Sequence, residues 1–156
     1  MVEDSPPLDS LVTCVGGGGL CAGIALALGE LSPNTKLYGA EPVGYDDHRR
    51  SLAAGERVAI ADAPPTLCDA IMTPMPGELT WSINSRALAR VFAVTDEDCL
   101  RAMRIAWETL ELRLEPGGAA ALAAVLNGEV RGMGRVGVVL SGGNVDEAVW
   151  RRALGS

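Results

Sequence analysis

Four consecutive glycines, Gly16 to Gly19, stand between a short apolar run at 10–15 and a helix-like run at 20–31. A strand that leads through a glycine loop into a helix N-terminus forms an anion seat. Glycine lacks a Cβ, so backbone N–H groups can close on a phosphate, and the helix dipole adds positive potential. The run matches neither the dinucleotide-binding nor the P-loop pattern, which disfavours both interpretations. A simple flexible turn is the alternative.

Strand and helix signals alternate along the rest of the chain. Strands are predicted at 10–15, 36–40, 90–94 and 136–140, with a further short strand at 67–72. Helices are predicted at 20–31, 46–54, 79–88, 116–127 and 146–154, with another that begins at Thr95. Such alternation is typical of a parallel sheet with helices on both faces, so we expect a three-layer α/β fold. The predicted organisation is a flexible tail at 1–9 and a single α/β domain at 10–156.

The helix that begins at Thr95 carries the clearest signals. The Thr95 hydroxyl can cap the backbone N–H near Asp98. Acidic residues in the first turn interact favourably with the positive end of the helix dipole. An apolar stripe at three- and four-residue steps is expected to face the core. The stripe consists of Leu100, Met103, Trp107, Leu110 and Leu114.

Composition excludes several classes of function. The net charge is −7 and the longest basic run is a pair, which argues against binding to nucleic acid or an anionic membrane. The apolar stretches are far shorter than a membrane span, and the acidic, proline-bearing start is unlike a targeting peptide. The four cysteines have no CxxC spacing and lie in apolar contexts. They predict buried thiols in a cytoplasmic protein.

Three loops at predicted strand ends carry glycine or polar residues. They are Gly16–Gly19, Glu41 to Asp47, and Ser141–Asn144. In open α/β sheets, ligands bind beyond the carboxyl ends of the strands. We therefore expect these loops to surround one phosphate-bearing cofactor, with a polar ring atom held by Ser141.

The same loops, in this order, resemble the second half of the fold-type II pyridoxal-phosphate enzymes, and in particular the serine/threonine dehydratases and serine racemase-like members. The matching stretches are Val15 to Leu20, Tyr38 to Pro42, Gly77 to Trp81, Leu114 to Ala120 and Leu140 to Asp146. The resemblance covers nearly the whole chain from about Leu8. It implies that the sheet is part of a tryptophan synthase β-like fold.

This resemblance implies pyridoxal 5′-phosphate as the cofactor. The N–H groups of Gly16–Gly19 would hold its phosphate, and Ser141 would hydrogen-bond its pyridine nitrogen. Leu20 and Gly142, which are next to these residues in the chain, are also expected to bind the cofactor. A serine there keeps that nitrogen largely unprotonated, which weakens the ring as an electron sink but suits loss of a β-hydroxyl from serine or threonine. Glu115 stands where the family has a glutamate near the cofactor. Alternatively, Glu115 is simply a residue at the N-terminus of a helix.

The loop from Glu41 to Asp47 resembles the divalent-cation loop of serine racemase-like members. By that resemblance, the carboxylates of Glu41 and Asp47 and the carbonyl of Tyr45 would bind Mg²⁺ or Ca²⁺, which prefer hard oxygen ligands. The alternative is a solvated pair of acids at a helix start. We expect His48 on the surface of that helix.

One element of the family's chemistry has no counterpart in this sequence. The family holds the cofactor aldehyde on a lysine in its first half, and that lysine also acts as the base at the α-carbon. The single lysine here, Lys36, opens a predicted strand at the end opposite the cofactor. We therefore assign no catalytic residue to this chain. Asp69-Ala70 also departs from the common Asp-Gly of relatives, and the extra methyl group can crowd the cofactor ring.

The resulting hypothesis is the C-terminal half of a serine/threonine dehydratase-like ammonia-lyase, inactive alone and completed by a missing N-terminal half that helps bind an amino-acid substrate. The alternative is a non-catalytic module that binds phosphate-bearing ligands or drives assembly. An uncovered sheet edge favours self-association. We expect a homodimer or larger oligomer that buries the strand near 10–15 or 136–140.

Overall fold

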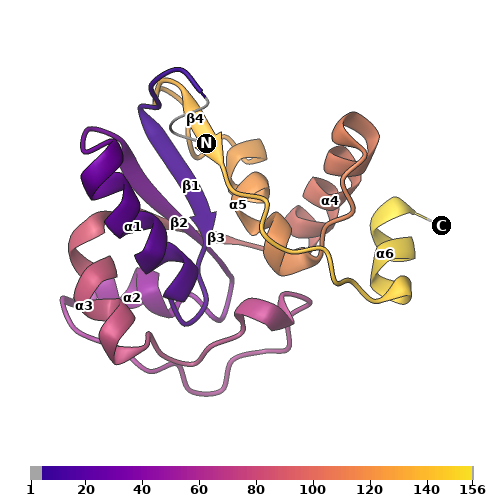
Figure 1. Ribbon diagram of the computed structural model, residues 1–156. Helices are drawn as coiled ribbons and strands as arrows, with labels where there is room; N and C mark the ends of the chain where they lie inside the picture. Colours follow the sequence, from indigo (N-terminus) through magenta and orange to yellow (C-terminus); the bar gives the residue numbers. More distant parts are fainter. Residues whose placement is uncertain (1–4, 156) are drawn as a thin grey trace.

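The computed structural model describes residues 5–155 and contains a four-stranded sheet whose strands all run parallel. The strands are β1 (Ser10–Cys14), β2 (Lys36–Pro42), β3 (Leu88–Val94) and β4 (Val136–Val138). Their order across the sheet is β3-β2-β1-β4 (Figure 1). Pairing of β1 with β2 runs from Ser10 opposite Lys36 to Cys14 opposite Ala40. The predicted α/β class with a parallel sheet is confirmed.

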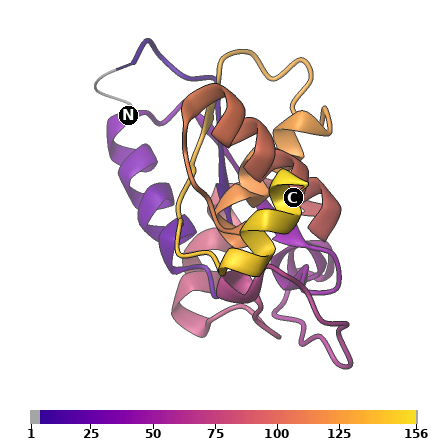
Figure 2. The ribbon, with the colours of Figure 1, turned by 90° about the vertical axis from the view of Figure 1, so that its right-hand side faces the viewer.

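Helices cover both faces of this sheet (Figure 1). One face carries α1 (Gly19–Leu31), α2 (Asp47–Ala54) and α3 (Glu78–Ala87). The other face carries α5 (Pro116–Leu126), which is covered by α4 (Asp96–Leu110). Figure 2 shows α6 (Glu147–Leu154) in front of α4, against which it packs. Among the described residues, no helix is long and apolar enough to cross a membrane.

The inner helix α5 lies close to the sheet because its side chains are small. Five of its alanines, Ala119, Ala120, Ala121, Ala123 and Ala124, are fully buried. Pro116 begins the helix at a position where its missing N–H costs no hydrogen bond. On the sheet, the rings of Tyr38 and Phe92 stack with their centroids 5.7 Å apart. This core fixes the strands whose ends form the site.

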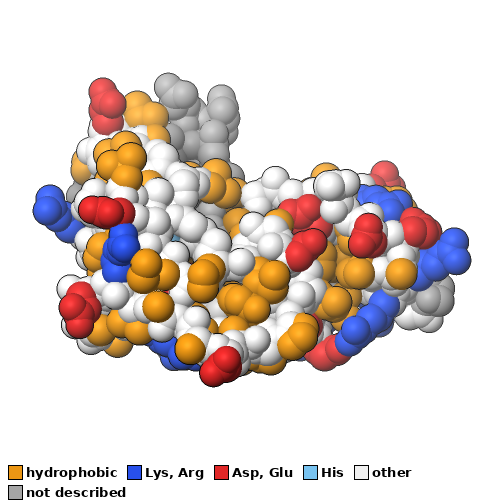
Figure 3. All heavy atoms as spheres, turned by 90° about the horizontal axis from the view of Figure 1, so that it is seen from below, with side chains coloured by type: hydrophobic (Ala, Val, Ile, Leu, Met, Phe, Trp, Pro, Cys, Tyr) orange, Lys and Arg blue, Asp and Glu red, His pale blue; other side chains and the backbone are white. Residues whose placement is uncertain are grey.

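All four strands end at the same edge of the sheet, so the loops that follow them lie at one end of the molecule. Figure 3 shows this end from below: it is hollowed, and apolar side chains gather across it. The exposed apolar residues near these loops include Leu20, Val43, Met72, Met75 and Leu79. The sheet topology thus brings the three predicted loops together.

One local prediction is wrong, and the structure adds detail at two others. Residues 67–72 form no strand but a short 3-10 turn, η1 (Asp69–Ile71), because the N–H groups of Ile71 and Met72 bond back to the chain just before them. The last strand is shorter than predicted and ends at Val138. The tail predicted at 1–9 is held at its end: the Asp9 N–H donates to the Arg135 carbonyl at 3.0 Å. Residues 1–4 lie outside the described part.

The prediction that the apolar stripe of α4 faces the core is only half correct. Leu100 and Met103 are buried as expected, but Trp107 is 42% exposed and Leu110 is 56% exposed. The C-terminal turns of α4 lie beyond the core, and there Trp107 packs edge-on against Trp150 of α6 with centroids 5.5 Å apart. Leu114 is buried, but it lies after the helix has ended.

Candidate functional site

The glycine loop connects β1 directly to α1. Gly18 is the N-cap of α1 and has φ 91° and ψ 2°, in the left-handed region that favours glycine. A Cβ at Gly16 would lie only 2.9 Å from the Cα of Ile71, so glycine is also required there by close packing. The N–H groups of Gly17, Gly18 and Gly19 donate no hydrogen bond to any described residue. They are free to bind a ligand.

A cavity of about 260 Å³ lies beside this loop. Its lining residues are Cys14, Gly16, Gly17, Gly18, Gly19, Leu20, Cys21, Ala70, Ile71, Glu115, Gly117 and Ser141. They come from the glycine loop and the start of α1, from η1, from the start of α5 and from the loop after β4. The structure therefore brings together all of the predicted cofactor residues except Gly142. Ala70, the departure noted in the sequence, is part of the wall.

Gly142 is held by contacts with Glu115 and Gly118. It does not line the cavity; its carbonyl accepts the backbone N–H of Glu115 at 2.9 Å. A Cβ at Gly118 would lie 2.6 Å from the Gly142 nitrogen, so these two glycines pass in close contact. Gly142 thus fixes the position of Glu115, whose side chain does line the cavity.

Cys14 is a site residue that the sequence reasoning missed. Its Sγ lies 3.1 Å from the Oγ of Ser141, across the cavity end of the sheet. Burial raises the pKa of the Cys14 thiol, against the lowering effect of the Ser141 hydrogen bond. Its position as the last residue of a strand before the glycine loop was the available signal. All four cysteines are buried and unpaired, as predicted.

A second cluster of polar groups is buried after β2. Glu41 is fully buried, and its carboxylate accepts the N–H groups of His48 and Arg49, each at 3.1 Å. It thereby caps the N-terminus of α2 from outside the helix. Burial raises the pKa of Glu41 to about 7, with a further raising effect from Asp47 and a lowering effect from His48.

His48 is fully buried, so its predicted surface position is wrong. Its Nδ1 lies 3.2 Å from Glu41 and 3.5 Å from Asp47, and its Nε2 lies 3.3 Å from Nδ2 of Asn84 in α3. Burial lowers the pKa of His48, but its contacts with Asp47 and Glu41 outweigh burial and raise the pKa to about 9. The Asn84 contact instead requires an unprotonated Nε2. The Gly18 carbonyl can only accept a hydrogen bond, so the Asn84 atom that faces it must be the amide nitrogen. The same nitrogen faces Nε2 of His48, and we therefore take His48 as the neutral ring with its proton on Nδ1.

The predicted cation ligands are partly brought together. One ligand atom from each of Glu41, Asp47 and His48 lies within 4.8 Å of the others. The Oδ2 of Asp47 is buried and accepts no hydrogen bond from a described residue. Tyr45 is half-buried in the turn between them, and its N–H donates to the Pro42 carbonyl at 3.0 Å. A buried, incompletely bonded carboxylate beside a second one fits a divalent cation.

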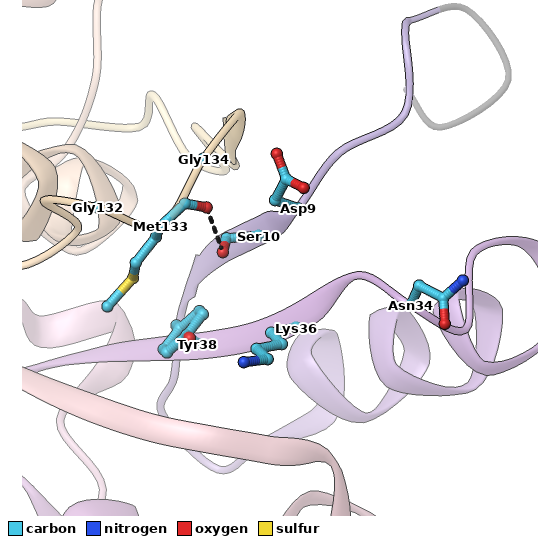
Figure 4. A pocket seen from close by; sticks show the side chains of 8 residues that line it. All are labelled: Asp9, Ser10, Asn34, Lys36, Tyr38, Gly132, Met133 and Gly134. Carbon is cyan, nitrogen blue, oxygen red and sulfur yellow. Dashed lines mark hydrogen bonds between the residues drawn. The ribbon is translucent and has the colours of Figure 1, made fainter.

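A different hollow, of about 420 Å³, lies at the opposite end of the sheet (Figure 4). Lys36 and Tyr38 of β2, Ser10 of β1 and the segment around Met133 line it. The start of β1 lies four residue steps from its end, which is about 13 Å along a strand. Lys36 therefore lies far from the glycine loop, as predicted. This hollow is larger than the cavity beside the glycine loop, but it lies at the end of the sheet where the strands begin, and ligands of open α/β sheets bind beyond the ends where the strands finish.

Known proteins are similar to this chain over almost its whole length. The chain is 38% identical over 150 residues to serine racemase of Dictyostelium discoideum and 38% identical over 147 residues to beta-hydroxyaspartate dehydratase of Paracoccus denitrificans. Each alignment covers 94% of this chain but 46% of the relative, so the chain spans about half the length of these relatives.

Solved structures give the same result. The crystal structure of the Dictyostelium serine racemase matches 93% of this chain and 47% of its own, with a TM-score of 0.84 and 38% identity. The crystal structure of the T.th. threonine deaminase matches 89% of this chain and 50% of its own, with a TM-score of 0.83 and 38% identity. A family model described as pyridoxal-phosphate dependent enzyme matches residues 1–142. This chain belongs to the pyridoxal-phosphate dependent enzyme family.

Proposed function

We propose that this chain forms the phosphate-binding and ring-binding part of a lyase site for small amino acids with a β-hydroxyl group. The observation that carries the proposal is a cavity lined both by Ser141 and by Gly17–Gly19, whose N–H groups donate no hydrogen bond to a described residue. The serine racemase, hydroxyaspartate dehydratase and threonine deaminase relatives support the substrate class. All three names refer to amino acids that carry a β-hydroxyl.

Each residue around the cavity has a definite task in this proposal. The loop N–H groups and the N-terminus of α1 bind the dianionic phosphate. Ser141 holds the ring nitrogen by a neutral hydrogen bond, which leaves that nitrogen largely unprotonated. When bound, pyridoxal phosphate supplies the electron sink for bond cleavage at the α-carbon of the amino acid. A weak sink suffices when a β-hydroxyl can leave as the α-proton is removed.

The proposal also assigns what this chain does not supply. The only lysine in the sequence lies at the other end of the sheet, so no amine near the cavity can hold the cofactor aldehyde. We infer that the lysine that holds the cofactor aldehyde belongs to an N-terminal half outside the present sequence, and that the chain alone is inactive. The exposed apolar side chain of Leu20 at the cavity, with that of Leu79 on α3, which contacts the glycine loop, offers a surface for that half.

A divalent cation is a second part of the proposal. Glu41 and Asp47, with the Tyr45 carbonyl, would hold Mg²⁺ or Ca²⁺ at the end of β2. The support is the burial of both carboxylates and the unbonded Oδ2 of Asp47. Two buried carboxylates that face each other across one imidazole offer the hard oxygen ligands that a divalent cation prefers.

The proposal is tested by titrating the purified chain with pyridoxal phosphate, followed by borohydride reduction and mass spectrometry. We expect saturable binding, no stoichiometric adduct on Lys36, and no 2-oxo acid from serine or threonine. Addition of the separately produced first half of a relative, such as the Dictyostelium serine racemase, is expected to restore deamination. Absence of binding would contradict the proposal. Binding without activity in the reconstituted mixture would favour the non-catalytic alternative.

A further inference from the structure

The outer side of the glycine loop is held by polar groups of α3. The Gly17 carbonyl accepts from Oγ1 of Thr80 at 2.5 Å and from the N–H of Gly77 at 3.3 Å. The Gly18 carbonyl accepts from Nδ2 of Asn84 at 3.1 Å, in addition to the α1 bond from Ala22 at 2.9 Å. Both carbonyls therefore point toward α3.

The direction of these carbonyls fixes the direction of the loop N–H groups. In a trans peptide the C=O of one residue and the N–H of the next lie in one plane and point in opposite directions. The C=O of Gly17 is thus opposed to the N–H of Gly18, and the C=O of Gly18 to the N–H of Gly19. When α3 holds the two carbonyls, the two N–H groups face away from α3, where the cavity lies.

Asn84 itself is held in place by further contacts. It is fully buried, and its amide nitrogen also contacts Nε2 of His48 at 3.3 Å. The other ring nitrogen of His48 contacts Glu41, and the ring lies edge-on to Trp81 with centroids 6.2 Å apart. A Cβ at Gly18 would lie 2.5 Å from the Asn84 nitrogen, so the amide is in direct contact with the loop.

A buried amide in a helix interior costs free energy unless its hydrogen bonds are made. Here Oδ1 of Asn84 accepts no hydrogen bond from a described residue, so packing alone gives no reason for an amide at this position. The two contacts of its amide nitrogen, with the Gly18 carbonyl and with Nε2 of His48, do give a reason for an amide here. We propose that Asn84, anchored by His48, is a positioning residue that orients the glycine loop for the cofactor phosphate. This inference rests on the proposed function and goes beyond the residues that line the cavity.

The experiment compares two ligands that differ only in the phosphate, pyridoxamine 5′-phosphate and pyridoxamine, each titrated by calorimetry into the purified chain. Neither ligand requires a lysine. In Asn84→Leu, which keeps the volume but has no donor, we expect affinity for the phosphorylated ligand to fall about tenfold, as for loss of one hydrogen bond near an anion. The affinity for pyridoxamine should not change. A purely structural role would weaken both ligands together.

Two further variants make the result decisive. Ser82→Ala, at an exposed position of the same helix, is the matched control and should bind both ligands as the wild type does. Thr80→Val removes the donor to Gly17 at a half-buried position, and it serves as a second test if Asn84→Leu does not fold. An unchanged ratio of the two affinities in a folded Asn84→Leu or Thr80→Val variant would overturn the inference alone. Failure of the wild type to prefer the phosphorylated ligand would overturn the proposed function as well.

Discussion

At Gly18 the backbone adopts φ 91°, and three polar side-chain atoms from α2 and α3 surround the place of a Cβ. The nearest are Nδ2 of Asn84 at 2.5 Å, Nε2 of His48 at 2.9 Å and Oγ1 of Thr80 at 2.9 Å. Gly19, the next residue, has no atom within 4 Å of its Cβ position. The two glycines therefore differ in what they permit, although the sequence shows them as equivalent.

This difference gives a prediction at the residue scale. Gly18→Ala should lower the free energy of unfolding by about 1–3 kcal/mol, because it combines left-handed strain with displacement of the buried Asn84. Gly19→Ala is the control and should leave stability unchanged or slightly raised. Urea unfolding of both variants measures this. Equal stability of the two variants would show that the loop relaxes without cost.

The cation proposal is also decided by single residues. If Ca²⁺ binds the folded site and not the unfolded chain, as proposed, millimolar Ca²⁺ should raise the melting temperature of the wild type. Asp47→Asn should abolish the calcium-dependent shift, because it removes the charge of the carboxylate whose Oδ2 is unbonded. Glu56→Gln, at an exposed position beyond α2, should retain the shift. A wild type that shows no shift, or an Asp47→Asn variant that keeps it, would count against the site.

At the scale of elements, α4 is the helix whose start the sequence located most securely. Thr95 and Asp98 form a reciprocal capping box: the Asp98 N–H donates to Oγ1 of Thr95 at 3.2 Å, and the Thr95 N–H donates to the Asp98 carboxylate at 3.0 Å. Burial raises the pKa of Asp98, but the hydrogen bonds from Thr95 outweigh burial and hold the pKa below its usual value.

The capping box predicts a pH-dependent contribution to stability. Thr95→Ala should cost about 1 kcal/mol near neutral pH. Because the folded-state pKa of Asp98 is depressed, its contribution is fully present above the unfolded-state pKa of about 3.9 and is lost as the pH falls through the lower folded-state value. The stability difference between the variant and the wild type should therefore narrow in acid, where the bond from the Thr95 hydroxyl to the Asp98 carboxylate is lost. Thr109→Ala, in the exposed last turn, should show no such convergence; a constant difference for Thr95→Ala down to about pH 3 would contradict the account.

The elements that sequence predicted well are those with local signals. The glycine run, the Thr95 cap, Pro116 and the apolar strands each act through neighbours in the chain, and each marks a boundary that the structure confirms within one or two residues. Cys14 and Asn84 were missed because their roles depend on distant contacts, and the burial of His48 depends in part on its contact with Asn84, 36 positions away. Asn84 meets Gly18 across 66 positions and Cys14 meets Ser141 across 127, and no local pattern records either approach.

At the scale of the whole molecule, β1 is an inner strand and the open edges are β3 and β4. Self-association through β1 is therefore ruled out by its two neighbours, whereas β4 remains a candidate edge. Together with the exposed apolar residues around the cavity, this edge predicts a homodimer or larger assembly of the isolated chain. Light scattering at high protein concentration measures the molar mass of the isolated chain and thus its oligomeric state. A monomer throughout the concentration range would contradict this expectation without affecting the cofactor site.

The central claim is that the cavity beside the glycine loop holds the phosphate of pyridoxal phosphate, and a crystal structure of the chain with this cofactor tests it most directly. The account predicts phosphate oxygens at roughly 2.7–3.2 Å from the N–H groups of Gly17–Gly19, with the ring nitrogen directed at Ser141. The Lys36 hollow at the other end of the sheet should be free of cofactor. Density for the cofactor beside Lys36, with none at the glycine loop, would contradict the account.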